Sequence, residues 1–128
     1  MKKTIMELAK SGLPVNLHNK AQGSYKRVLC VCTGGILRSA TAAEILSREP
    51  YNMNTRCAGI TSEWSLIPVS ERLLEWADEI VCFEQWHEAK LRQITDKPIH
   101  NLDIYDGYTF RNPMLVRLIC IKCEKLFA

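Results

Sequence analysis

The chain has 128 residues, 47% of them hydrophobic and 24% charged, and 17 Lys and Arg against 14 Asp and Glu leave a formal charge of +3. These proportions are typical of one soluble globular domain and exclude disordered, collagen-like and low-complexity classes. The nearly balanced charge disfavours nucleic acid as a partner, because nucleic-acid-binding domains usually carry a clustered basic surface. No apolar run reaches the roughly 18 residues of a membrane span, and Glu7 and Lys10 interrupt any signal-peptide core. We therefore expect a cytoplasmic protein that does not bind membranes.

The six cysteines are interpreted as reduced thiols. Three disulfides would be typical of a small secreted domain, and we expect no secretion signal here. A reduced thiol can serve as a core residue, a metal ligand or a nucleophile. Its position in the pattern of strands and loops distinguishes these roles.

Residues 1–24 are predicted to be an appendage to an α/β domain that spans residues 25–128. Apolar residues between Ile5 and Ala9 recur at helical spacing, and a polar connector follows over residues 13–24. The pattern predicts a short helix and a linker. An exposed apolar face on that helix would allow two copies of the chain to form a homodimer through residues 1–24.

After this appendage, continuous apolar runs alternate with stretches of helical periodicity. The runs predict buried strands at residues 28–32, 55–60, 80–83 and 98–104, and the periodic stretches predict helices at 38–49, 68–77, 84–94 and from Asn112-Pro113 onward. Strands that alternate with helices imply parallel β-α-β units with right-handed crossovers. The expected fold is a flavodoxin-like three-layer α/β/α arrangement around a four-stranded parallel sheet.

Core faces are predicted for all four of these helices, including the last two. His87, Leu91 and Ile94 share one face of the helix at 84–94, where His87 is interpreted as a partly buried, hydrogen-bonded residue rather than a catalytic base. In the closing helix the predicted core stripe consists of Leu115, Leu118, Ile119, Lys122 or Cys123, and Leu126.

The loop after the first strand, Cys32-Thr33-Gly34-Gly35-Ile36-Leu37-Arg38-Ser39, is predicted to bind an anion. Ligands of open parallel sheets bind beyond the carboxyl ends of the strands. The two glycines tolerate the backbone angles of a loop whose N–H groups wrap a phosphate, and the following helix adds its positive N-terminal dipole. The planar guanidinium of Arg38 suits two phosphate oxygens. These surroundings would favour the thiolate form of Cys32.

This pattern resembles the phosphate loop of the low-molecular-weight protein tyrosine phosphatases, C-x-G-N-x-C-R-S. Cys32, Gly34, Arg38 and Ser39 match it. The resemblance extends in order over residues 25–127. It includes Ala42-Ala43-Glu44, Cys57-Ala58-Gly59-Ile60, and two segments similar to the phage and bacterial branch of predicted tyrosine phosphatases, Ile104-Tyr105-Asp106-Gly107-Tyr108 and Asn112-Pro113-Met114-Leu115-Val116.

The resemblance implies a two-step hydrolysis of a phosphorylated protein or a small aryl phosphate, with no metal or other cofactor. Cys32 would form a phosphocysteine, and Ser39 would hydrogen-bond the sulfur. The loop N–H groups of Thr33, Gly34, Gly35, Ile36, Leu37 and Arg38, together with the Arg38 side chain, would bind the phosphoryl oxygens. Trp64, Tyr105 and Tyr108 would form apolar walls around an aromatic ester.

The general acid that the resemblance implies is Asp106, in Asp106-Gly107-Tyr108, where the family has Asp-Pro-Tyr. Asp103 is the second candidate, although it precedes Ile104 and is predicted within the last strand. The alternative role for Asp106 is that of a turn residue, which Asp-Gly favours by itself. Asn112 is excluded because an amide does not donate a proton as a carboxylic acid does.

Four positions depart from the family pattern. Gly35 replaces the asparagine that braces the loop, so the loop is predicted to be less firmly held. Leu37 replaces the second loop cysteine, which removes the disulfide that protects the nucleophile in many members. Ala40 replaces a proline at the helix start. Ile36 stands where members that prefer phosphoarginine have threonine, which favours a phenolic ester.

The other cysteines leave alternatives open. Cys30 faces the same way as Cys32 and is either a core residue or a thiol that protects Cys32 as a disulfide. The remaining four, Cys57, Cys82, Cys120 and Cys123, are interpreted as core residues, and a zinc site made of Cys30, Cys32, Cys120 and Cys123 is disfavoured. Two further functions compete: an arsenate-reductase-like redox enzyme that uses Cys82 or Cys30, and a non-catalytic phosphate-binding module.

Overall fold

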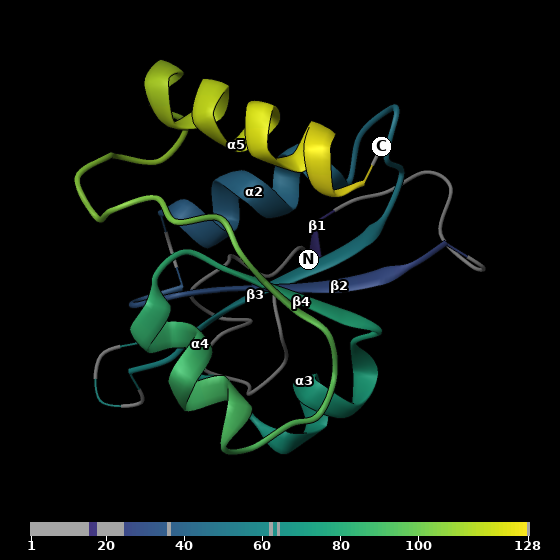
Figure 1. The fold of residues 1–128 in the computed structure, drawn as a ribbon, viewed down its shortest axis with the longest axis vertical. Coiled ribbons are helices and arrows are strands. Elements are labelled where there is room, and N and C mark those ends of the chain that lie inside the picture. Colours follow the sequence, from purple (N-terminus) through teal and green to yellow (C-terminus); the bar gives the residue numbers. More distant parts are fainter. Residues whose placement is uncertain (1–15, 18–24, 36, 62, 64, 128) are drawn as a thin grey trace, which may run out of the picture.

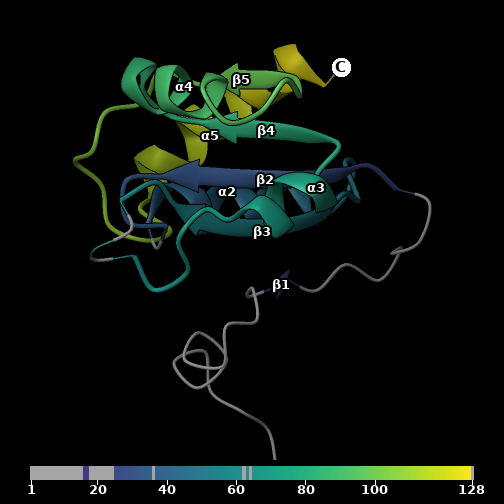
Figure 2. The ribbon, with the colours of Figure 1, turned by 90° about the horizontal axis from the view of Figure 1, so that it is seen from below.

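A central parallel sheet places the predicted anion-binding loop at one edge of the molecule (Figures 1 and 2). The structure is a computed structural model that describes residues 16–17, 25–35, 37–61, 63 and 65–127. The predicted N-terminal helix lies outside these residues. The elements are β1 (Asn16–Leu17), β2 (Arg27–Cys32), α2 (Arg38–Leu46), β3 (Asn54–Gly59), α3 (Glu71–Trp76), β4 (Glu79–Cys82), α4 (Gln85–Arg92), β5 (Ile99–Asn101) and α5 (Pro113–Leu126).

The strand order across the sheet is β1-β3-β2-β4-β5, and the last four are parallel to one another. When the four parallel strands are numbered 1 to 4 from β2 to β5, their order across the sheet is 2-1-3-4. The predicted flavodoxin-like fold is thereby confirmed. In Figure 2 the arrows of the parallel strands point to the same side, so the loops that follow them gather there. The carboxyl ends of β2, β4 and β5 therefore bring together segments that are far apart in the sequence.

β1 was not predicted. Two residues of the predicted connector, Asn16 and Leu17, pair antiparallel with β3. The unpaired N–H and C=O groups of an edge strand accept any extended segment, so this pairing needs no apolar pattern in the added strand. Hydrophobic periodicity, which predicts the other strands, therefore does not predict β1.

Helices cover both faces of the sheet, α2 and α5 on one side and α3 and α4 on the other (Figure 1). Side chains of β2 alternate between the two resulting cores, as the pleat of a strand requires. Val28, Cys30 and Cys32 pack on the side of α2 and α5, whereas Leu29 and Val31 pack on the other. All five are at most 3% exposed, which explains the uninterrupted apolar run of this strand.

Several element boundaries differ from the predicted ones. α2 ends at Leu46 and not at residue 49, because the chain turns back and Met53 N–H donates to the Leu46 carbonyl. α3 begins at Glu71, where the Ser70 hydroxyl caps it by accepting from Leu73 N–H at 3.2 Å. β5 ends at Asn101 because Asp103, with φ +54°, bends the chain away from the strand direction.

Two predicted core positions are wrong. Ile94 is 58% exposed because α4 ends at Arg92, before the periodicity that included this residue is complete. Leu126 is 41% exposed because α5 ends there, and the next residue, Phe127, packs against the core instead. The predicted positions His87, Leu91, Leu115 and Ile119 are fully buried. In the described part of the chain, no helix has the length and apolar character needed to cross a membrane.

Candidate functional site

The loop between β2 and α2 depends on a close approach of its backbone to β3. Gly35 has φ +75°, in the left-handed region that favours glycine. A Cβ atom at this position would lie 2.5 Å from the carbonyl carbon of Ala58 and 2.5 Å from the backbone nitrogen of Gly59. At Gly34, by contrast, a Cβ atom would meet nothing within 4 Å. Only Gly35 is therefore required by the geometry of the loop.

Cys32 ends β2 and is almost fully buried at the base of this loop, with 3% of its surface exposed. Its Sγ atom accepts a hydrogen bond from the backbone N–H of Gly35 at 3.1 Å. A second hydrogen bond joins Sγ to Ser39 Oγ, also at 3.1 Å, from the first turn of α2. The structure thus brings together the cysteine, the glycine and the serine that the sequence pattern singled out.

Arg38 lies buried beneath the loop, 1% exposed, and its guanidinium contacts three parts of the chain. Nη1 donates to Glu84 Oε2 at 2.9 Å and to the Ile104 carbonyl at 2.7 Å. Nη2 donates to Thr33 Oγ1 at 3.2 Å. Among the described residues Nε has no hydrogen-bond acceptor, so the N–H group of this nitrogen is unused.

Of the two candidate acids, the structure brings Asp106 to Arg38. Asp106 Oδ1 is 3.8 Å from Arg38 Nε, and 54% of the aspartate side chain is exposed. Among the described carboxylates, only those of Asp106 and Glu84 lie within 4.0 Å of this guanidinium. Asp103 is exposed and lies at the bend after β5.

The segment that carries Asp106 is fastened to α2 at its far end. Arg111 N–H donates to Thr41 Oγ1 at 3.1 Å, and Arg111 Nε donates to Glu44 Oε2 at 2.6 Å. Glu44 also accepts from Arg48 Nη2, just after the end of α2, at 2.6 Å. The loop between β5 and α5 is therefore tied both to Arg38, through Ile104, and to α2, through Arg111.

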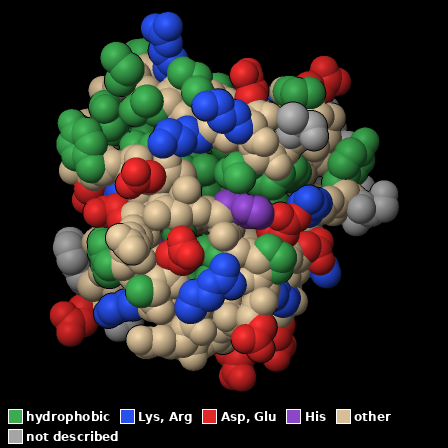
Figure 3. Space-filling model, viewed as in Figure 1, with side chains coloured by type: hydrophobic (Ala, Val, Ile, Leu, Met, Phe, Trp, Pro, Cys, Tyr) green, Lys and Arg blue, Asp and Glu red, His purple; other side chains and the backbone are tan. Residues whose placement is uncertain are grey.

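The aromatic residues predicted as substrate walls are only partly described. The Tyr105 and Tyr108 rings pack with their centroids 5.4 Å apart, and Tyr105 is 67% exposed whereas Tyr108 packs on the core. Figure 3 shows hydrophobic side chains gathered over the start of α5, where Phe110 and Met114 are also exposed. Trp64 and Ile36 lie outside the described residues. Leu37 is 37% exposed at the N-terminus of α2.

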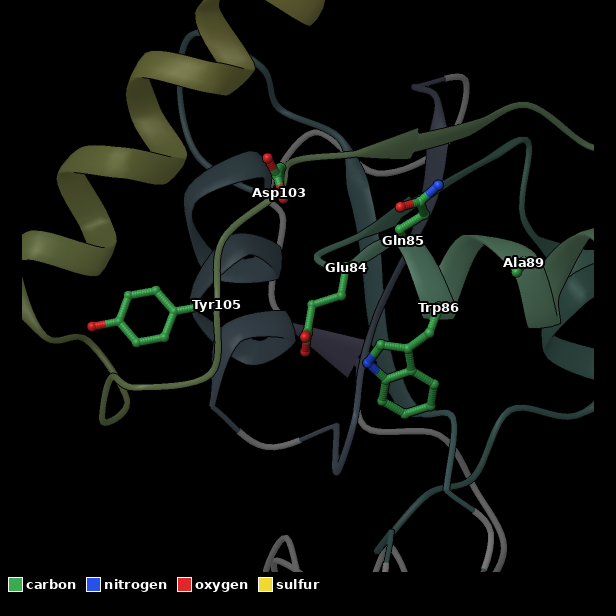
Figure 4. A pocket seen from close by; sticks show the side chains of 6 residues that line it. All are labelled: Glu84, Gln85, Trp86, Ala89, Asp103 and Tyr105. Atoms are coloured by element: carbon green, nitrogen blue, oxygen red, sulfur yellow. The ribbon is translucent and has the colours of Figure 1, made fainter.

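An open depression lies at the start of α4, near the loop between β2 and α2 (Figure 4). Its lining residues are Glu84, Gln85, Trp86, Ala89, Asp103 and Tyr105. Cys32 does not line it, and the Tyr105 ring points away from the other labelled side chains. Glu84 connects this depression to the loop, because its carboxylate holds Arg38.

The role of Glu84 as the carboxylate partner of Arg38 was not predicted, although its position in the sequence indicates it. Glu84 comes directly after the apolar run, separated from the end of β4 at Cys82 by Phe83 alone. The carboxyl ends of neighbouring parallel strands meet at one edge of the sheet, so an acidic residue just after β4 lies near the loop after β2.

His87 is fully buried in the first turn of α4, with both ring nitrogens hydrogen bonded. Nδ1 accepts from the backbone N–H groups of Phe83 at 3.3 Å and Glu84 at 3.2 Å. Nε2 lies 3.0 Å from Thr33 Oγ1. Burial, with a smaller contribution from the charge of Arg38, lowers the pKa of His87 to about 4, so the ring is neutral near pH 7.

The other cysteines are free thiols, and four of the five are buried. Cys30 and Cys57 lie side by side in the register of β2 and β3, in the same core as Cys32 and Cys123. Burial and these neighbouring thiols raise the pKa of Cys30 well above its ordinary value. Cys82 packs in the opposite core, whereas Cys120, also predicted as a core residue, is only half-buried and belongs to neither core. Among the described residues, no group of three or more His, Cys, Asp or Glu is arranged to hold a metal ion.

The fold and the loop define an α/β protein in which a cysteine and an arginine meet at the carboxyl edge of a parallel sheet. Two solved structures share this fold. YfkJ from Bacillus subtilis superimposes with a TM-score of 0.58 at 21% identity, covering 83% of this chain and 94% of YfkJ. A YwlE mutant from Bacillus subtilis gives a TM-score of 0.54 at 21% identity, covering 80% of this chain and 99% of YwlE.

The resemblance to the low-molecular-weight tyrosine phosphatases is thereby confirmed as a similarity of fold. No protein-family model matches the chain, and a comparison with curated proteins finds no match either.

The two loop glycines provide a matched test of the backbone geometry. Gly35→Ala is expected to lower the free energy of unfolding by more than about 2 kcal/mol, because the new methyl group meets the β3 backbone at a positive φ. Gly34→Ala should change it by less than about 0.5 kcal/mol, since that site is open. Urea unfolding of both variants measures the difference. Equal effects would contradict the assigned contact with β3.

The low pKa of His87 predicts a pH dependence of stability. His87 has a pKa of about 4 in the folded chain against an ordinary 6.5, so between these values the unfolded chain binds the additional proton. The free energy of unfolding should therefore fall as the pH drops from 6.5 towards 4, by at most about 1.4 kcal/mol per pH unit from this group. Urea unfolding of the wild type and His87→Asn at several pH values isolates this contribution. Parallel pH profiles would contradict it.

Proposed function

We propose that the protein is a cysteine-dependent phosphatase that hydrolyses phosphotyrosine or related aryl phosphate monoesters through a phosphocysteine intermediate. The observation that carries this proposal is the set of contacts around one loop. Gly35 N–H and Ser39 Oγ bind the Cys32 sulfur, and the same loop leads into a buried Arg38 with an unused Nε donor. The fold shared with YfkJ and YwlE supports it.

In the first step the Cys32 thiolate attacks phosphorus in line with the departing phenol oxygen. The S–P bond forms as the P–O bond breaks, and the Asp106 carboxylic acid transfers its proton to the phenolate. Arg38 Nε and the loop N–H groups stabilise the negative charge on the non-bridging oxygens. The 3.8 Å separation of Asp106 Oδ1 from Arg38 Nε supports the assignment of Asp106 as the proton donor.

In the second step water attacks the phosphocysteine, and the Asp106 carboxylate accepts the proton of that water. The P–O bond to the water oxygen forms as the S–P bond breaks. The Ser39 hydroxyl, 3.1 Å from Sγ, donates a hydrogen bond to the departing thiolate and stabilises it. Inorganic phosphate leaves, and the protein returns to its starting state with no redox change.

The proposed substrates are a phosphorylated protein or a small aryl phosphate. The exposed ring of Tyr105, packed against Tyr108, offers an apolar surface near Asp106 for an aromatic leaving group. No step of this reaction uses a metal or another cofactor. A cytoplasmic location and a homodimer through residues 1–24 remain part of the proposal.

The arsenate-reductase-like alternative requires a second thiol that reaches Cys32. Cys82 packs in the core on the opposite face of the sheet from Cys32, which argues against it as the resolving cysteine. Cys30 shares the face of Cys32 but is fully buried, and its raised pKa disfavours the thiolate that such a step needs. Both features favour hydrolysis over redox chemistry.

Cys32→Ser is expected to abolish hydrolysis of p-nitrophenyl phosphate, because a serine hydroxyl is far less ionised than a thiol at neutral pH. The assay contains no added metal and no thioredoxin. Cys120→Ser, in the half-buried part of α5, is the matched control and should retain wild-type activity. Activity that survives Cys32→Ser would refute the phosphocysteine mechanism. A folded wild type that binds phosphate without turnover would favour the non-catalytic phosphate-binding module.

Asp106→Asn tests the general acid against its nearest competitor, Asp103→Asn. Loss of the proton donor should slow poor leaving groups by about 100-fold or more and good leaving groups much less, since only a basic phenolate needs protonation. Steady-state kinetics with aryl phosphates whose phenols differ in pKa give the slope of log kcat against leaving-group pKa, which measures this difference. Asp103→Asn should leave the slope unchanged, because its carboxylate does not contact Arg38. A steeper slope for Asp103→Asn would transfer the role of acid to that residue.

A further inference from the structure

The buried ring of His87 has a defined proton position. Its Nδ1 atom accepts from two backbone N–H groups, those of Phe83 and Glu84, and therefore carries no proton itself. The neutral ring must then carry its single proton on Nε2. That N–H points to Thr33 Oγ1 at 3.0 Å, whereas the nearest Glu84 oxygen is 3.7 Å away. His87 is thus a hydrogen-bond donor to the first residue after Cys32.

Thr33 Oγ1 receives a second donor from Arg38. Nη2 of the guanidinium, which only donates, lies 3.2 Å from the same oxygen. A hydroxyl oxygen has two lone pairs, so both acceptor positions are occupied. The hydroxyl hydrogen has to be donated elsewhere, and the described part of the chain offers it no acceptor.

The direction left for this hydrogen follows from burial. His87 and Arg38 are 0% and 1% exposed and occupy the inner side of the threonine oxygen, whereas Thr33 itself is partly exposed. The free O–H direction therefore leads away from these two buried groups, towards the partly exposed side of Thr33. Arg38 Nε, which also has no acceptor among the described residues, lies 3.8 Å from Asp106 Oδ1.

We propose that the Thr33 hydroxyl is an oxyanion donor, held in donor orientation by His87 and Arg38, which hydrogen-bonds a non-bridging oxygen of the bound phosphoryl group. The proposal rests on the function proposed above. It adds a side-chain donor to the backbone donors of the loop and explains why a fully buried, neutral histidine faces this position. Because the donor orientation exists before the anion binds, no reorientation of the hydroxyl opposes binding.

The experiment compares Thr33→Val, which is nearly isosteric and lacks the hydroxyl, with Thr33→Ser, which keeps it. Thr61→Val is the matched control: Thr61 is partly buried near the same loop, where its N–H donates to the Thr33 carbonyl, and its side chain forms no hydrogen bond with the described residues. Two quantities are measured: kcat/KM for p-nitrophenyl phosphate, and the Kd of inorganic phosphate by calorimetry in a Cys32→Ser background. Urea unfolding verifies that each variant is folded.

The hydrogen bond to a charged oxygen predicts about a 10- to 100-fold loss in kcat/KM for Thr33→Val and a weaker Kd for phosphate. Thr33→Ser should recover most of both, and Thr61→Val should resemble the wild type. A Thr33→Val variant as active as Thr61→Val would overturn the donor role while the phosphatase proposal stands. If Thr33→Ser is as impaired as Thr33→Val, the methyl group and not the hydroxyl matters, and the proposal is wrong.

The binding measurement separates this inference from the proposed hydrolysis. If the wild type shows no turnover but Thr33→Val still weakens phosphate binding relative to Thr61→Val, the donor role is supported and the catalytic function fails. If phosphate does not bind to the Cys32→Ser protein at all, the donor role is refuted.

Discussion

The buried guanidinium of Arg38 connects the carboxyl ends of three strands. It donates to Thr33 after β2, to Glu84 after β4 and to the Ile104 carbonyl after β5. Placing a cation in the interior is costly unless carboxylate and carbonyl oxygens replace the lost water. The paired Glu84 and the two neutral acceptors meet this need and leave Nε facing Asp106. The strand ends, the loop and the candidate acid are thus positioned by a single side chain.

Around this charge, the remaining geometry depends on backbone contacts that admit few alternatives. Gly35 approaches β3 so closely that no side chain fits, which turns the loop N–H back onto the Cys32 sulfur. His87 caps α4 with one ring nitrogen and contacts Thr33 with the other, so the N-terminus of a helix on the far face of the sheet reaches the loop. The asparagine that braces this loop in the similar phosphatases is absent here, and Thr33 with its two donors, His87 and Arg38, supplies cross-links of a different kind.

In the loop after β5, the candidate acid could be predicted from the sequence, but the contacts that anchor the loop could not. The resemblance to the Asp-Pro-Tyr loop favours Asp106 over Asp103, and in the structure the Asp106 carboxylate lies 3.8 Å from the Arg38 guanidinium. The anchoring of this loop by Arg111 on Glu44 was not predicted, because a contact between residues 67 positions apart leaves no local pattern. The contact of Glu84 with Arg38 and that of His87 with Thr33 were likewise not predicted, since each joins segments that follow different strands.

By itself the sequence determined the order of the four parallel strands and of the helices between and after them, and the position of Cys32, Arg38 and Ser39 on one loop. These features depend on hydrophobic periodicity and on short spacings, both of which are local. The tertiary structure decided which carboxylates meet Arg38, which glycine is indispensable and which direction the Thr33 hydroxyl takes. Such properties arise only when the sheet aligns its strand ends and excludes water from the groups between them, because burial makes every polar group depend on the particular partner it finds.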